Sequence, residues 1–196
     1  MFNQATLPLL FVLSPSLQSD PGAALERRLR RAVLRRQPIA LGTAVNPYEP
    51  PAGRREENPL RRALLREEGL EIAITTGTPR ILRELDLLVE LDRRHSVAVR
   101  MIVPITDADD PEPRMRAVHA LAAEGIAASV LLSPAPGNRH GEEVLRFLME
   151  EARQAEALDV EIDGGTLRRD ERASLSSTFS RLRLEYGFPR RAPGRG

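Results

Sequence analysis

The sequence contains no cysteine, and all 29 of its basic residues are arginine. Without cysteine the chain cannot form a disulfide, use a thiolate nucleophile or hold an iron–sulfur cluster through thiolate ligands. Without lysine it cannot form a Schiff base or supply the lysine of a phosphate-binding P-loop. Only five phenylalanines and two tyrosines are present, so side chains that could stack on nucleic-acid bases are scarce.

Long apolar runs are missing as well. The longest run near the start, over residues 7–13, is interrupted by Pro8 and is far shorter than the roughly 20 residues that span a bilayer. The first residues carry no basic charge and no cleavage pattern of a signal peptide follows them. We therefore expect a cytoplasmic protein without a membrane partner. The net charge of +1 creates no global field that would attract nucleic acid.

Six short apolar segments with β-branched residues predict strands, and amphipathic stretches between them predict helices. The strand-like segments are nearly continuous in apolar character, which is typical of parallel strands buried on both faces. The predicted strands are 9–13, 39–43, 72–76, 97–103, 126–132 and 158–162. The predicted helices are 20–36, 59–68, one that starts at Thr78-Pro79 and buries Ile81, Leu82, Leu85, Leu88 and Val89, one from Pro111 or Pro113 to Gly125, 142–157 and 167–186.

Strands and helices alternate at a spacing of about 30 residues, which indicates an α/β fold with parallel strands. Right-handed connections then allow either an open doubly wound sheet or a partial barrel. No GxGxxG motif follows a predicted strand, which weakens the dinucleotide-binding version of the fold. We predict a single domain over residues 1–188 and a disordered basic tail over 189–196.

Ligands of parallel α/β folds bind where the strands end, so the segments after the strands hold the candidate site. The most distinctive one, residues 42–51, places the side chains of Thr43, Asn46 and Tyr48 in one proline-rich loop. Thr76 ends the third predicted strand, and Ser133 directly follows the fifth. The simpler interpretation is that these polar groups satisfy turns and helix caps.

Other polar clusters give weaker signals. The acidic residues over 107–112 precede a predicted helix and are expected to complement its dipole rather than bind a metal ion. His95, His119 and His140 lack the spacing of metal ligands, so no metal site is predicted. Ser133 and His140 do not form a known triad pattern, which leaves catalytic residues unassigned. Residues 27–36 are predicted to form an amphipathic helix with a solvated arginine face.

Several of these segments together resemble a known family. Residues 39–50 resemble the GTxTDPYQP stretch of the radical S-adenosylmethionine superfamily, in the branch related to spore photoproduct lyase. Residues 73–88 resemble that family's VTKSP…LRDLDLL, and residues 116–126 resemble its next helix and the start of the following strand. Ser133-Pro134 falls at its proline-rich turn. The likeness covers roughly residues 11–162, with several motifs in the same order and spacing.

The resemblance implies a fold and a cofactor. Members of the family form a partial (β/α) barrel, so we expect an incomplete (β/α) barrel of about five to six parallel strands with helices on its outer face. Members bind a 4Fe–4S cluster through a CxxxCxxC loop and cleave S-adenosylmethionine to a radical. By the resemblance, the cofactor-binding rim would be formed by Thr43, Asn46, Tyr48, Thr76 and Ser133.

The sequence departs from the family pattern at several places. The CxxxCxxC loop is not present in this chain, Asn46 stands where the family has Asp, and Glu49 stands where it has Gln. Gly77 replaces a Lys, and the loop before the fourth helix is shortened to residues 107–113. Truncation of the start would not explain changes in several later loops. These changes indicate relaxed constraint on cofactor binding, so no cofactor is expected on this chain.

Four hypotheses follow. The first is a degenerate radical S-adenosylmethionine-like domain without its own activity, which binds a protein partner or a small ligand at the strand ends. The second is a fragment of a radical S-adenosylmethionine enzyme whose cluster-binding segment is missing or supplied separately. The third is a non-redox enzyme with Asp107 or Asp163 as a base. The fourth is nucleic-acid binding through residues 27–36, which is the least favoured partner class.

Overall fold

The computed structural model describes residues 9–11, 39–41, 68–106, 109–134, 141–163 and 167–188. The chain divides into two compact units, residues 1–99 and 100–196, and the boundary falls inside one strand, β4 (Ser96–Ile105). The predicted helix over 20–36, nearly all of the one over 59–68 and the predicted tail lie outside the described residues.

A strand is present at each of the six predicted positions. Neighbouring strands pair in parallel in the β1–β2, β2–β3 and β5–β6 ladders, with Leu131 opposite Glu161 in the last one. Besides β4, the strands are β1 (Leu9–Phe11), β2 (Ile39–Leu41), β3 (Glu71–Thr76), β5 (Ala127–Pro134) and β6 (Val160–Ile162).

The order of the strands decides between the two predicted architectures. The strands follow one another in the sheet in sequence order, β1-β2-β3-β4-β5-β6. A doubly wound sheet would reverse its order at a switch point, whereas sequential parallel strands are the arrangement of a (β/α) barrel. Among the described strands, β1 and β6 form the two edges. The predicted α/β fold, an incomplete (β/α) barrel of parallel strands, is confirmed.

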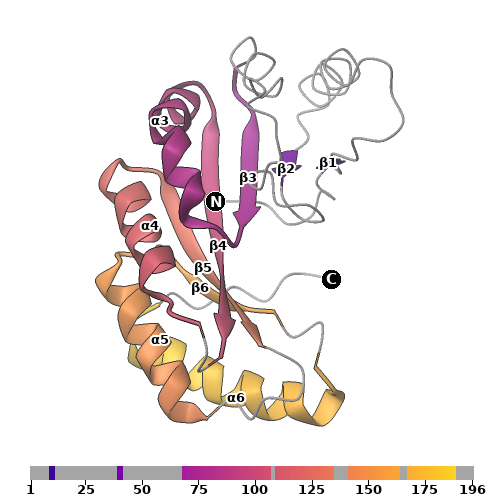
Figure 1. Cartoon of the computed structure of the whole chain (residues 1–196). Helices are drawn as coiled ribbons and strands as arrows, with labels where there is room; N and C mark the ends of the chain where they lie inside the picture. Colours follow the sequence, from indigo (N-terminus) through magenta and orange to yellow (C-terminus); the bar gives the residue numbers. More distant parts are fainter. Residues whose placement is uncertain are drawn as a thin grey trace, which may run out of the picture. The chain divides into compact units, whose positions relative to one another are not determined.

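In the unit of residues 100–196, three helices build the outer layer. The helix α4 (Glu112–Ala123) packs on β5, and α5 (Glu142–Gln154) packs between α4 and α6 (Arg169–Glu185), which also contacts β6. Figure 1 shows α4 and α5 side by side along one face of this part of the sheet. The core between the helices and the strands consists of fully buried side chains, among them Val103, Leu121, Val130, Leu132, Leu145 and Met149.

The strands β4 and β5 are fully buried on one face only, which corrects the expectation of burial on both faces for these strands, whereas all three residues of β2 are buried as expected. Along β4 and β5, buried side chains alternate with half-buried ones. The buried set includes Met101 and Val130, and the half-buried set includes Arg100 and Ser129. The sequence hid this difference because alanine, proline and leucine also occupy the half-buried positions, and apolar residues are common on protein surfaces.

The unit of residues 1–99 contains a helical segment of two types. Thr78 accepts a hydrogen bond at Oγ1 from the Arg80 amide at 3.3 Å and begins η1 (Pro79–Glu84), a 3₁₀ helix. The α-helix α3 (Leu85–Arg94) continues from it. The predicted start is therefore confirmed. Because a 3₁₀ helix has fewer residues per turn, it shifts the phase of the buried face along the segment.

That phase shift changes which side chains enter the core. Ile81 and Leu88 are buried as predicted, but Leu87 and Leu91 are buried in place of three predicted residues. Those three, Leu82, Leu85 and Val89, are half-buried. The prediction assumed one continuous α-helical period, and the change of helix type at Glu84 breaks that period.

The three predicted helices that follow β4 agree well with the structure. The turn after α4 contains Gly125 at a φ of +80°, a backbone conformation that glycine adopts without strain and that commonly ends helices. The predicted inward side chains of the last helix, Leu175, Phe179 and Leu182, are all buried. None of the helices in the described part of the chain is long and apolar enough to cross a membrane.

His95 connects the end of α3 to the start of β3. Its Nδ1 accepts a hydrogen bond from the Leu70 amide at 3.3 Å, and both residues are buried. On either side, Gly69 donates to the Arg94 carbonyl at 2.9 Å and Ser96 donates to the Leu70 carbonyl at 2.8 Å. The lone pair on Nδ1 therefore completes a set of hydrogen bonds that joins helix and strand.

We expect His95→Ala to lower the free energy of unfolding by about 1–3 kcal/mol, because the buried Leu70 amide loses its acceptor. His95→Asn is the matched control, since its Oδ1 can accept the same hydrogen bond, and its effect should be smaller. Urea unfolding followed by circular dichroism measures both variants. Equal stability of the alanine variant and the original protein would contradict this role.

Candidate functional site

A pocket of about 600 Å³ opens at the C-terminal end of β4, a size typical of small-ligand and peptide-anchor sites. One wall comes from the end of β4 and the residues before α4, namely Pro104, Thr106, Asp109, Asp110 and Pro111. The other wall comes from the first two turns of α5, and we call the cavity the α4–α5 pocket. It lies entirely within the unit of residues 100–196.

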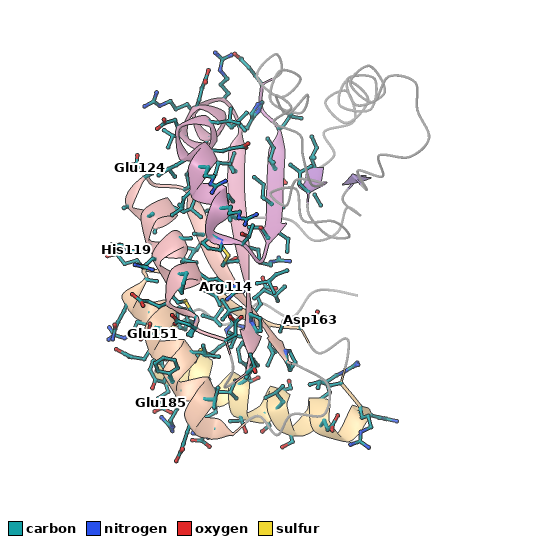
Figure 2. All side chains as sticks on the ribbon, in the orientation of Figure 1. Arg114, His119, Glu124, Glu151, Asp163 and Glu185 are labelled. Atoms are coloured by element: carbon teal, nitrogen blue, oxygen red, sulfur yellow. The ribbon has the colours of Figure 1, made fainter. Side chains whose placement is uncertain are left out.

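The two aspartates of the pocket support the start of α4. Asp110 accepts a hydrogen bond at Oδ1 from the Glu112 amide at 2.9 Å, which satisfies one of the free N–H groups at the helix start. Asp109 forms an ion pair with Arg114 at 2.9 Å, and Figure 2 shows Arg114 near the start of α4. The acidic segment therefore complements the helix end, as the sequence predicted.

The α5 wall combines a carboxylate with apolar side chains. Glu143, Val144, Phe147 and Leu148 line it, and their spacing of three and four residues places them on one side of the helix. Leu148 is buried, whereas Phe147 is 52% exposed. The pocket therefore contains an aromatic ring and a carboxylate that lie one helical turn apart on α5.

Glu142, the neighbour of Glu143, is neutralised by arginines. Its carboxylate accepts hydrogen bonds from Arg181 of α6 at 2.6 Å and from Arg146 at 3.0 Å. These bonds, the one from Arg181 above all, lower the pKa of Glu142 because they favour the ionised form. Arg146 also bonds to Glu185 of α6, so α5 and α6 are joined by a small network of ion pairs.

The half-buried face of the sheet forms a second polar region in the same unit. Arg100 of β4 donates to Glu161 of β6 at 3.3 Å, which places both side chains over the intervening strand β5. Ser129 and Ser133 of β5 lie on this same half-buried face. In a (β/α) barrel this face lines the interior, where side chains near the strand ends approach a ligand.

The predicted site residues have different outcomes. Thr43, Asn46 and Tyr48 lie outside the described residues. Thr76, at the end of β3, is buried, and its Oγ1 accepts a hydrogen bond from the Thr78 amide at 3.3 Å. Ser133 is half-buried near the end of β5. The two residues belong to different compact units.

Sequence reasoning missed the residues that α5 contributes. Glu143 and Phe147 were not predicted because the strand-end rule was applied to the loops and not to the first turns of the helices. Phe147 falls outside the buried stripe formed by Leu145, Leu148 and Ala152. A single exposed aromatic residue is common on protein surfaces, so the sequence pattern alone does not indicate an interaction site.

The residues of this chain do not fit the iron–sulfur cluster that the resemblance implies. Such clusters are held by cysteine thiolates, and the sequence has no cysteine. Within the described ranges, no group of three or more His, Asp or Glu side chains could hold a metal ion either. His119 lies near Glu156, with 3.9 Å between Nδ1 and Oε2, and both side chains are mostly exposed.

Comparison with known proteins gives relatives without a described activity. No family model matches the chain. Proteins described as uncharacterized, from two strains of Mycobacterium tuberculosis and from Mycobacterium bovis, are 27% identical to it over 180 residues. The match covers 86% of this chain and 53% of each relative. The chain therefore spans about half the length of the curated relatives it matches.

We expect Arg181→Gln to raise the pKa of Glu142 toward its ordinary value of 4.5, because the variant removes the largest favourable hydrogen bond. A carboxylate with a lowered pKa stabilises the folded state above its unfolded pKa, and that contribution is lost as the pH falls through the lowered value. The variant should therefore be less stable than the original protein at neutral pH but not in strong acid.

Carbon-detected NMR titration of the glutamate carboxyl groups measures this pKa. Arg169→Gln, at the other end of α6, is the control, because it removes an arginine that is not bonded to Glu142. An unchanged Glu142 titration in the Arg181 variant would contradict the assignment.

Proposed function

We propose that this chain is a degenerate domain related to radical S-adenosylmethionine enzymes of the spore photoproduct lyase branch. In this proposal it performs no radical chemistry on its own and binds a ligand or a protein partner at the C-terminal rim of its sheet. The supporting observation is a sequential parallel sheet in a chain without cysteine. The sequential parallel sheet agrees with the fold that the resemblance implies, and the absence of cysteine removes the cluster ligands.

The rim is the favoured place for binding because parallel α/β proteins bind ligands beyond the C-terminal ends of their strands. The α4–α5 pocket and Ser133 lie at these ends in one unit, and Thr76 lies at the end of β3 in the other. Thr43, Asn46 and Tyr48 follow β2 in the sequence and belong to the same proposal. A cytoplasmic location is also part of the proposal.

Anaerobic reconstitution with iron and sulfide tests the proposal. We expect the purified chain to show no stable 4Fe–4S absorbance and no matching electron paramagnetic resonance signal after reduction. The physical reason is that carboxylates and histidines cannot replace a full set of thiolates around such a cluster. A stable cluster bound stoichiometrically to this chain would overturn the proposal.

A second candidate is that the chain is part of a radical S-adenosylmethionine enzyme whose cluster-binding segment is supplied by other sequence. The observation in its favour is that the curated relatives are about twice as long as the matched segment. The decisive experiment uses the gene with its flanking coding sequence. A longer product that carries a CxxxCxxC motif and binds a cluster would support this candidate, and the absence of an in-frame motif would exclude a cluster-binding segment encoded in the same chain.

A further inference from the structure

The carboxylates of the α4–α5 pocket differ in whether a cation balances them. Asp109 is paired with Arg114, and Asp110 uses Oδ1 to bond the Glu112 amide. Glu143 has no hydrogen-bond or ion-pair partner among the described residues, although Glu142 beside it is bonded to two arginines. The pocket therefore contains one carboxylate that is free to bind a ligand and a second, on Asp110, that keeps an oxygen available.

The helix ends near the pocket do not reverse this charge. The N-termini of α4 and α5 lie at its two walls, and each carries about half a positive elementary charge. The acidic residues in and before their first turns supply whole negative charges, which exceed those partial charges. The described part of the pocket is therefore negative and favours a cation.

The aromatic ring defines the kind of cation. Phe147 lies one turn after Glu143 on α5, and half of its surface is exposed. A planar guanidinium group can stack on a ring and donate paired hydrogen bonds to carboxylates, whereas a lysine ammonium group offers a strongly hydrated point charge. The apolar side chains Val144, Leu148 and Pro104 can contact the methylene stem of an arginine.

We propose that the α4–α5 pocket binds an arginine side chain of a peptide segment from a partner protein. The guanidinium stacks on Phe147 and donates hydrogen bonds to Glu143 and to the free oxygen of Asp110. This inference deepens the proposal of partner binding at the rim and rests on it. A short basic peptide fits the pocket because its volume of about 600 Å³ exceeds what a single arginine side chain fills and leaves room for neighbouring residues.

Fluorescence anisotropy with a labelled peptide of four arginines, each flanked by alanine, tests the site on the full chain. At physiological ionic strength we expect saturable binding, with a several-fold weaker affinity for the corresponding lysine peptide. Glu143→Gln should raise the Kd for the arginine peptide about tenfold, because a charge-assisted hydrogen bond is lost. Phe147→Leu should raise it about threefold, because the cation loses the ring.

Glu151→Gln is the matched control, since it removes the same charge from the same helix outside the pocket (Figure 2). It should change the Kd by less than about twofold, because only a screened long-range charge is lost. Unchanged circular dichroism and thermal midpoints must accompany each variant, so that a loss of binding reports on the site and not on folding.

Three outcomes would overturn the assignment of this pocket to an arginine side chain. The first is no saturable binding of the arginine peptide, the second is equal affinity for the arginine and lysine peptides, and the third is an equal effect of the Glu143 and Glu151 variants. N-acetylarginine amide, titrated alone, shows whether a small organic cation is sufficient, and binding as tight as that of the peptide would overturn the assignment to a peptide segment. The iron–sulfur reconstitution is read separately, so a failure here is distinguishable from a failure of the proposed function.

Discussion

The sequential order of the parallel strands determines where this protein can bind a ligand. Parallel strands joined by right-handed connections, in sequential order, place consecutive helices on the same face of a sheet. In the unit of residues 100–196, α4 and α5 lie on one face and leave the other half-buried. In this unit the same connections bring the end of β4 and the starts of α4 and α5 together, and the α4–α5 pocket lies between them.

The strands were predictable from sequence, but the environment of their second face was not. Each of the six apolar segments contains a strand, because buried β-branched and leucine residues are a strong local signal. Whether the side chains of Leu131 and Ala98 are covered depends on which face of the sheet the helices pack on. The β–α–β connections as a whole determine that face. The 3₁₀ turn at Pro79–Glu84 had a similar effect, since a local change of helix type altered the buried set that a regular period predicted.

None of the site residues predicted from the sequence lines the α4–α5 pocket. The rule that ligands bind beyond the strand ends includes the residues after β4 but does not select them over the other strand ends. It does not distinguish Glu142 from Glu143, which are identical neighbours at the start of α5. The structure separates them through Arg181, which is 39 residues later in the sequence and bonds only to the first. Likewise, the sequence predicts that the hydroxyl of Thr76 can bind a ligand, but in the structure this hydroxyl accepts a hydrogen bond from the Thr78 amide.

Under the proposal of a degenerate domain, the core of the unit of residues 100–196 explains how the fold persists without a cofactor. Its stability comes from apolar side chains between the strands and α4, α5 and α6, such as Leu121, Val130 and Leu145, each of them fully buried. Large-to-small changes there cost several kcal/mol, so selection for folding alone preserves them. Replacement of cluster ligands in a loop would cost no such stability once the chemistry of the cluster is lost. Under the proposal, the rim would then remain as a formed surface, and its pocket would stay available for binding.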